Sequence, residues 1–242
     1  MQVAGIDLAW GTRTLTGVAV TDENGALLRS ASVRSDSEIA EFLEGSAPAV
    51  IAIDAPIIVT NATGMRECER ELSRHFRKFH AGTHPTNSSQ PSMQPEPRAR
   101  RLVDAHGWTT DHTSPPSSKT PVALEVYPHS SMVGLFGLDR VIAYKAKSGR
   151  TPEMRRTEFT RLMQLMESRC DRSLHLSSSA RWLELKATAL SAHRHSQLNA
   201  IEDEIDAIFC AYVAWAFATA SDTLVPYGTA KTGIIMTFPP PS

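Results

Sequence analysis

The chain has 242 residues, of which 41% are hydrophobic and 21% are charged, as in globular proteins with a sizeable buried core. Its formal net charge of −1 excludes a protein that binds nucleic acid or membranes through its overall charge. Three cysteines, none in a C-x-x-C pair, exclude a disulfide framework and favour a reducing compartment, so we expect a cytoplasmic protein.

Neither a signal peptide nor a membrane span is expected. The first residues, MQVAGIDLAW, have neither a basic region nor a long apolar region. The longest uncharged apolar run, 207–220, is shorter than the roughly 18–20 residues needed to cross a bilayer. We therefore interpret this run as part of a buried helix.

The N-terminal part of the chain predicts three antiparallel strands, a helix and a fourth strand. Apolar and β-branched runs predict the three strands at 2–7, 14–20 and 26–33. The pair Asn24-Gly25 is a strong hairpin signal between the last two. A capping box from Ser35 to Glu38 begins a short helix. The run 49–54 is apolar without alternation, which is typical of a strand covered on both faces.

The remainder is mainly helical. We predict helices at 63–80, 130–137, 152–170, 178–194 and 202–220. A buried strand is expected at 122–127, and a last apolar run at 233–238 predicts an added edge strand. The segment 81–121 holds seven of the 15 prolines and many Ser and Thr residues. We expect one domain, 1–242, with a flexible insertion or lid at 81–121.

Asp7 and Asp54 have the same setting, because each follows an apolar strand and precedes a loop. Side chains at such positions project from the carboxyl ends of strands, where open α/β sheets bind ligands. A single aspartate there would be explained by capping a turn. Two neighbouring aspartates repel each other unless a cation lies between them, and oxygen ligands select Mg²⁺ or Mn²⁺.

Asp203 and Asp206 are three residues apart and therefore share one face of the helix predicted at 202–220. In the first turn of that helix, compensation of the helix dipole would explain Glu202, Asp203 and Glu204. It explains Asp206 less well, since apolar residues surround it. A carboxylate on a buried helix face needs a partner, and a metal ion would be one.

Glu125 is a fourth acidic candidate. It lies inside the apolar strand predicted at 122–127, where a carboxylate is costly without a partner. His129 follows shortly, but a lone histidine is more often a structural hydrogen-bonding group than a catalyst.

Two groups of basic residues could contact phosphate. One is a helical face formed by Arg66, Arg70, Arg74 and Arg77, which Arg98, Arg100 and Arg101 could extend. A solvated helix with ion pairs four residues apart explains this face equally well. The other is the glycine-containing loop with Lys145, Lys147 and Arg150, which runs into a helix start with Thr151 as N-cap.

Six motifs together resemble a known family. They are, in chain order, GIDLAWG…TG, AIDAPI, N-x-TG-x-R, EVYPH, YKxKxGR and D-x-x-DAI-x-CAY. The resemblance covers nearly the whole chain, from Val3 to about Pro239. This pattern is similar to the domain-of-unknown-function 429 family, described as predicted ribonuclease H-like nucleases. The resemblance implies an α/β fold with a mixed five-stranded sheet of order 3-2-1-4-5 flanked by helices, here with a Pro/Ser-rich insertion. It also implies metal-binding acids on the first strand, the fourth strand and the last helix, which correspond to Asp7, Asp54 and Asp206.

We therefore expect a metal-dependent hydrolase that cleaves phosphodiester bonds of nucleic acid or nucleotides with two Mg²⁺ or Mn²⁺ ions. Asp7, Asp54, Asp203 and Asp206 would hold metal, Glu125 would assist catalysis, and Lys145, Lys147 and Arg150 would neutralise phosphate. One alternative is a phosphotransferase of the actin-like kinase type, in which residues 5–17 cradle ATP, although 242 residues leave little room for a second core. Another is a non-catalytic nuclease-fold binding module, which the near-neutral charge favours.

Overall fold

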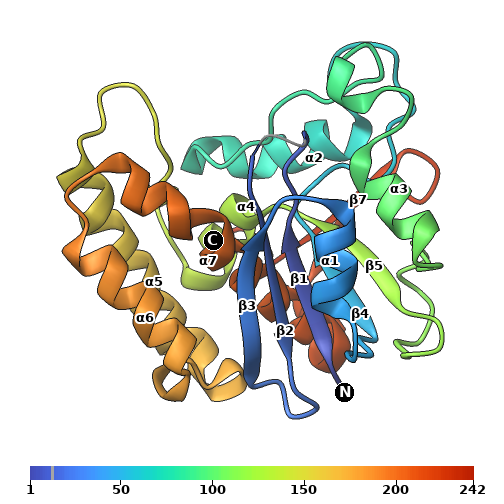
Figure 1. The fold of residues 1–242 in the computed structure, drawn as a ribbon. Helices are drawn as coiled ribbons and strands as arrows, with labels where there is room; N and C mark the ends of the chain where they lie inside the picture. Colours follow the sequence, from blue (N-terminus) through green and yellow to red (C-terminus); the bar gives the residue numbers. More distant parts are fainter. Residues whose placement is uncertain (12–13) are drawn as a thin grey trace.

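A mixed sheet forms the centre of the computed structural model, which describes residues 1–11 and 14–242 (Figure 1). Within these residues its seven strands are β1 (Val3–Asp7), β2 (Thr16–Thr21), β3 (Leu27–Val33), β4 (Val50–Ile53), β5 (Val122–Val126), β6 (Val225–Thr229) and β7 (Gly233–Thr237). Their order is β3-β2-β1-β4-β5-β7-β6. The strands β1, β4, β5 and β7 are parallel, whereas β2, β3 and β6 pair antiparallel with their neighbours.

The predicted α/β class is confirmed, and the first five strands have the expected order. The expected strand count is wrong, because the sheet of the described residues has seven strands instead of five. The run predicted as an edge strand forms β7, which lies between β5 and β6 and is therefore internal. The edge strand on this side of the sheet is β6. Its sequence VPYGT contains a proline and a glycine and is not typical of a strand.

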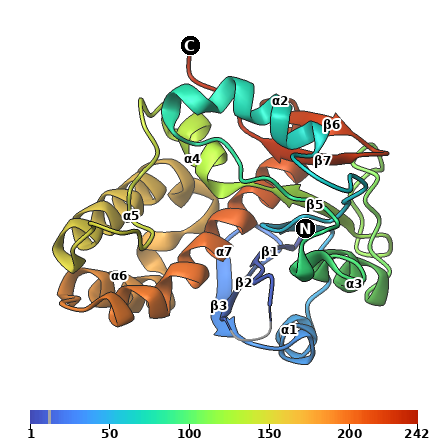
Figure 2. The same cartoon turned by 90° about the horizontal axis from the view of Figure 1, so that it is seen from above.

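Helices cover both faces of the sheet (Figure 2). They are α1 (Asp36–Leu43), α2 (Glu67–Phe76), α3 (Arg98–Ala105), α4 (Pro128–Phe136), α5 (Pro152–Leu174), α6 (Ala180–Ser191) and α7 (His195–Ala220). The longest, α7, packs against β1, β2 and β4, with α4, α5 and α6 beside it, while α1 and α3 lie on the opposite face. In the described part of the chain, no helix combines the length and the hydrophobicity needed to cross a membrane.

Each face of the sheet has its own apolar core, and alternate residues of the central strands contribute to each. Val3, Ala52 and Leu124 are buried on the α7 face. Ile6 and Ile53 are buried on the α1 and α3 face. The central strands are apolar without alternation because both faces are covered.

Two strand glycines bring α7 close to the sheet. A Cβ atom at Gly5 would overlap the backbone of Ala207 and Ala211, and one at Gly17 would overlap the backbone of Asp203. Glycine inside a strand often marks such a close approach of another backbone. As a result, the middle of α7 lies directly against the carboxyl end of β1.

The start of α7 corrects one expectation. The helix begins at His195, seven residues before the predicted start, because Gln197 accepts hydrogen bonds from the backbone N–H groups of His193 and Arg194, both at 3.0 Å. Asp203 and Asp206 therefore lie well inside the helix and not in its first turn. Compensation of the helix dipole does not account for them, since this effect is confined to the first turn.

The segment 81–121, for which we predict a flexible insertion or lid, packs against the domain. It contains α3, which the sequence pattern does not predict, and buries Leu102 and Val103 in the core of that face. Arg98 is 4% exposed and forms an ion pair with Asp36 at 2.6 Å. These contacts fix α3 beside α1.

Candidate active site

Asp7 and Asp54 lie side by side at the carboxyl ends of adjacent parallel strands. Ile6 is the register partner of Ile53, and the N–H of Asp54 donates to the carbonyl of Ile6 at 2.8 Å. Adjacent strands are about 4.8 Å apart, and side chains alternate between the two faces. Because Gly5 faces α7, both aspartates project toward α7.

Asp206 is the third carboxylate and comes from α7. Its side chain is fully buried and accepts a hydrogen bond from the hydroxyl of Tyr144 at 2.7 Å. Its other oxygen, Oδ2, lies 2.5 Å from Nζ of Lys145. The fold therefore brings Asp7, Asp54 and Asp206 close together, as the sequence predicts.

Lys145 stands among the carboxylates. Besides Asp206, its Nζ lies 3.5 Å from Oε1 of Glu202 and 3.7 Å from Oδ2 of Asp7. Sequence reasoning assigned Lys145 to phosphate, whereas in the structure its ammonium is the shared partner of three acids. Its side chain remains 25% exposed, so it can also reach solvent.

A buried arginine supports the outer part of this cluster. Arg155 is fully buried and donates to Oε2 of Glu202 at 2.7 Å and to the carbonyl of Tyr144 at 2.8 Å. Arg150 donates to the carbonyl of Lys145 at 2.7 Å and so holds the loop that carries the ammonium. Lys147 is exposed on the same loop. Sequence reasoning gave no role to Tyr144, although it begins the YKxKxGR motif, and explained Glu202 by the helix dipole.

The crowded carboxylates bind protons more tightly than usual. Burial raises the pKa of Asp7 well above its ordinary value of 3.8, Lys145 opposes this rise, and Asp206 and Asp54 add to it. Burial likewise raises the pKa of Asp54 to about 7 and that of Asp203 to about 6. One ammonium therefore does not neutralise the cluster, and further positive charge would stabilise it.

The donor set suits a hard divalent cation, but the observed arrangement is not itself a coordination site. Oδ2 of Asp7 is buried and has no hydrogen-bond partner among the described residues, and the cation near it is the Lys145 ammonium at 3.7 Å. Within residues 1–11 and 14–242, however, no three His, Cys, Asp or Glu side chains are spaced to hold a metal ion. Since Lys145 stands between them, a divalent ion could be held by Asp7, Asp54, Asp203 and Asp206 only after the ammonium moves.

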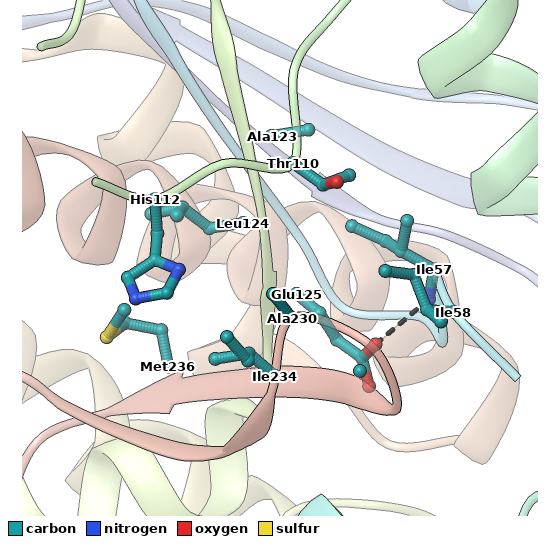
Figure 3. A pocket seen from close by; sticks show the side chains of 11 residues that line it. Ile57, Ile58, Thr110, His112, Ala123, Leu124, Glu125, Ala230, Ile234 and Met236 are labelled. Carbon is teal, nitrogen blue, oxygen red and sulfur yellow. Dashed lines mark hydrogen bonds between the residues drawn. The ribbon is translucent and has the colours of Figure 1, made fainter. Parts of the chain in front are cut away.

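Glu125 lies outside this cluster. It is the register partner of Ile53, so it faces away from α7, on the side opposite to Asp54. Its carboxylate accepts the N–H of Ile57 at 2.9 Å, as Figure 3 shows, and pairs with Arg66 at 2.6 Å. The partner that a buried Glu125 requires is therefore an arginine, and a structural role explains it.

His129 lies between two tyrosines beside the cluster. Its ring centroid is 5.6 Å from that of Tyr127 and 5.7 Å from that of Tyr144. Burial lowers its pKa to about 4, so the imidazole is neutral at pH 7. Its Nδ1 atom is buried without a hydrogen-bond partner in the described part of the chain.

Two members of the predicted basic set are buried, whereas Arg70, Arg74 and Arg77 are exposed. Arg66 is 3% exposed and donates to Glu69 and Glu125. Arg98, proposed as an extension of this face, is buried against Asp36. Both arginines therefore hold the fold together and do not offer charge to a phosphate at the surface.

The chain matches the family model described as "Protein of unknown function (DUF429)" over residues 5–231. The chain belongs to this family. The assignment made from the six motifs is thus confirmed, and the DUF429 match extends from β1 to the turn before β7 and includes Asp7, Asp54, Lys145 and Asp206. No curated protein and no solved structure shows a significant match to the chain.

Proposed function

We propose that this DUF429 protein is a metal-dependent phosphodiesterase with a ribonuclease H-like core that hydrolyses phosphodiester bonds of nucleic acid or a nucleotide. The observation that supports this most is the convergence of Asp7, Asp54 and Asp206 from β1, β4 and α7, where one ammonium group pairs with Asp7 and Asp206 and Asp54 lies beside Asp7. These are the three elements from which the resemblance expects metal-binding acids.

The properties of the acids favour a role in binding cations. The pKa of Asp54 is raised to about 7 by burial and by neighbouring carboxylates, and that of Asp7 is raised as well. Divalent ions, when bound here, would lower the pKa of water and neutralise charge on the phosphate. Asp203 lies one turn before Asp206 on α7 and would assist in holding them.

Lys145 would change partner in this scheme. Before a cation binds, its ammonium balances Asp7, Glu202 and Asp206. If a divalent ion took its place, the partly exposed side chain would be free to donate to a phosphate oxygen. Tyr144 keeps Asp206 in place meanwhile through its hydrogen bond of 2.7 Å.

The two alternatives stay predictions. For a phosphotransferase of the actin-like kinase type, residues 5–17 would cradle ATP, and Thr12 and Arg13 of that segment lie outside the described residues. For a non-catalytic binding module, the carboxylates would hold cations without turnover.

Activity measurements with matched aspartate variants test the proposal. We expect Mn²⁺-dependent cleavage of bis(p-nitrophenyl) phosphate or of an oligonucleotide, and a fall of roughly 100-fold or more in Asp7→Asn and Asp54→Asn. Asp139→Asn makes the same change at an exposed position and should keep wild-type activity. Full metal-dependent activity in Asp7→Asn would overturn the proposal.

A further inference from the structure

A pocket opens beside Asp54 at the carboxyl edge of the parallel strands. It spans about 390 Å³, a volume that includes solvent at its open mouth, and its lining includes Trp10, Asp54, Pro56, His84, Val126 and Tyr127. Trp10 follows β1, Asp54 follows β4 and Tyr127 follows β5, so this pocket is built by the same strand ends as the acidic cluster. It shares Glu125 with the separate hollow drawn in Figure 3.

Two aromatic side chains, Trp10 and Tyr127, line the pocket. Trp10 is 41% exposed, so part of its ring is open to solvent where it lines the pocket. The backbone beside it is fixed, because Arg98 donates to the carbonyl of Ala9 at 2.8 Å. Tyr127 is half-buried, and its hydroxyl donates to the carbonyl of Gly82 at 3.4 Å.

The pocket is suited to a flat, uncharged ring more than to a phosphate. Ala55, Pro56, Val126 and Ile235 form apolar parts of the lining. Arg66 is the arginine of the lining, and its donors already serve Glu69, Glu125 and the carbonyl of Ile58. Among the described lining residues, no guanidinium is therefore free for a phosphate, whereas a planar ring could stack on an aromatic face.

We propose that this pocket binds a nucleobase of the substrate, so that the adjoining phosphodiester lies at the carboxylates. The inference rests on the proposed phosphodiesterase function and specifies its substrate. A base that enters a pocket has to leave its stack, which favours single-stranded nucleic acid over a duplex. Trp10 is a positioning residue in this account, since it holds the base while the acidic cluster acts on the phosphate.

Binding of an uncharged nucleoside tests the pocket without the metal site. Adenosine, with ribose as the base-free control, is titrated into the protein in EDTA while tryptophan fluorescence and calorimetric heat are recorded. We expect saturable binding of adenosine and none of ribose. Trp10→Ala should weaken adenosine binding roughly 10-fold or more, and Trp10→Phe should retain most of it.

Trp108→Phe is the matched control, because Trp108 stacks on His106 away from the pocket and should leave the affinity unchanged. Equal binding by wild type and Trp10→Ala, or no adenosine binding, would overturn the inference even if the protein cleaves phosphodiesters. Conversely, Trp10-dependent binding in a protein that neither binds Mn²⁺ nor cleaves would support the pocket and overturn only the phosphodiesterase proposal.

Discussion

The carboxylates around Lys145 set how stability depends on pH. The pKa of Asp54 is about 7 in the folded chain, against an ordinary value of 3.8, so the folded state binds this proton more tightly than the unfolded state. Stability from this group is therefore gained as the pH falls from about 7 toward 4 and is lost as the pH rises. In EDTA, denaturant unfolding of wild type should show a larger free energy of unfolding at pH 5.5 than at pH 8, by on the order of 2 kcal/mol.

Asp54→Asn separates this effect from other titrating groups. The variant cannot ionise at this position, so its free energy of unfolding should change less between the two pH values than that of wild type. A dependence as steep in the variant as in wild type would show that Asp54 is not the group responsible.

The ammonium of Lys145 affects both the stability of the metal-free protein and its affinity for Mn²⁺. Its ammonium partners Asp206 and Asp7, so Lys145→Ala should destabilise the metal-free protein by about 3 kcal/mol because buried carboxylates lose their counter-charge. The same variant should bind Mn²⁺ roughly 10-fold more tightly, since the ion no longer competes with an ammonium. Thermal unfolding with and without Mn²⁺ measures both effects.

Lys147→Ala removes an exposed lysine of the same loop and is the control, with unchanged stability and affinity expected. Weaker Mn²⁺ binding in Lys145→Ala would contradict the view that the ammonium occupies the place of a cation.

The roles of single acidic residues were predictable where the apolar sequence around them indicates burial and the structure buries them on the expected face. Asp7 and Asp54 follow apolar strands, and Asp206 is surrounded by apolar residues, so each needs a partner. Glu125 satisfies the same rule but pairs with Arg66, because its position in the register places it on the other face. The face depends on strand pairing, which the local sequence does not determine.

Among the elements, α7 depends on the glycines beneath it. Gly5→Ala or Gly17→Ala would place a Cβ atom against the backbone of α7. This backbone, unlike the end of a flexible side chain, cannot move aside without displacing the helix. We expect a loss of about 3 kcal/mol or more in the free energy of unfolding, with displacement of Asp203 and Asp206. Chemical denaturation measures the loss.

Gly11→Ala is the matched control, because a Cβ atom there meets no atom of the described residues within 4 Å, and its stability should stay near that of wild type. If Gly5→Ala were equally stable, the close approach of α7 would not be what positions the acids.

Strands and long helices were predictable because apolar runs and helical periodicity are local. The start of α7 was missed because its cap is formed by Gln197, with no Ser, Thr, Asp or Asn at the cap position. Helix α3 was missed because prolines before and after it conceal a short amphipathic stretch whose Leu102 and Val103 are buried only by tertiary packing. Such elements depend on the rest of the fold for their stability.

At the scale of the whole molecule, charge controls how nucleic acid could bind. The formal net charge is −1, and Asp7, Asp54 and Asp206 would repel phosphate. We therefore expect weak binding of a single-stranded oligonucleotide in EDTA and roughly 10-fold or tighter binding when Ca²⁺ is added, because the ion neutralises both partners. Fluorescence anisotropy with a labelled oligonucleotide measures this difference, and equal affinity in EDTA and Ca²⁺ would contradict it.

Whole-molecule architecture was predictable through the fifth strand and not beyond it. The order β3-β2-β1-β4-β5 follows from hairpin signals and the family resemblance, whereas β7 pairs with β5 from the far end of the chain. Pairing between residues more than one hundred positions apart leaves no trace in local composition. The extension matters for the site, because Ile235 of β7 completes the pocket beside Asp54.

Calorimetric titration of Mn²⁺ into metal-free wild type, Asp7→Asn and Asp139→Asn tests the central claim most directly. In the part of the chain that the structure describes, Asp7 offers a buried oxygen without a hydrogen-bond partner beside Asp54 and Asp206, whereas Asp139 is exposed. We predict saturable binding by wild type and Asp139→Asn, and affinity at least roughly 10-fold weaker in Asp7→Asn. No binding by wild type, or equal binding by wild type and Asp7→Asn, would contradict the claim that these carboxylates hold divalent cations.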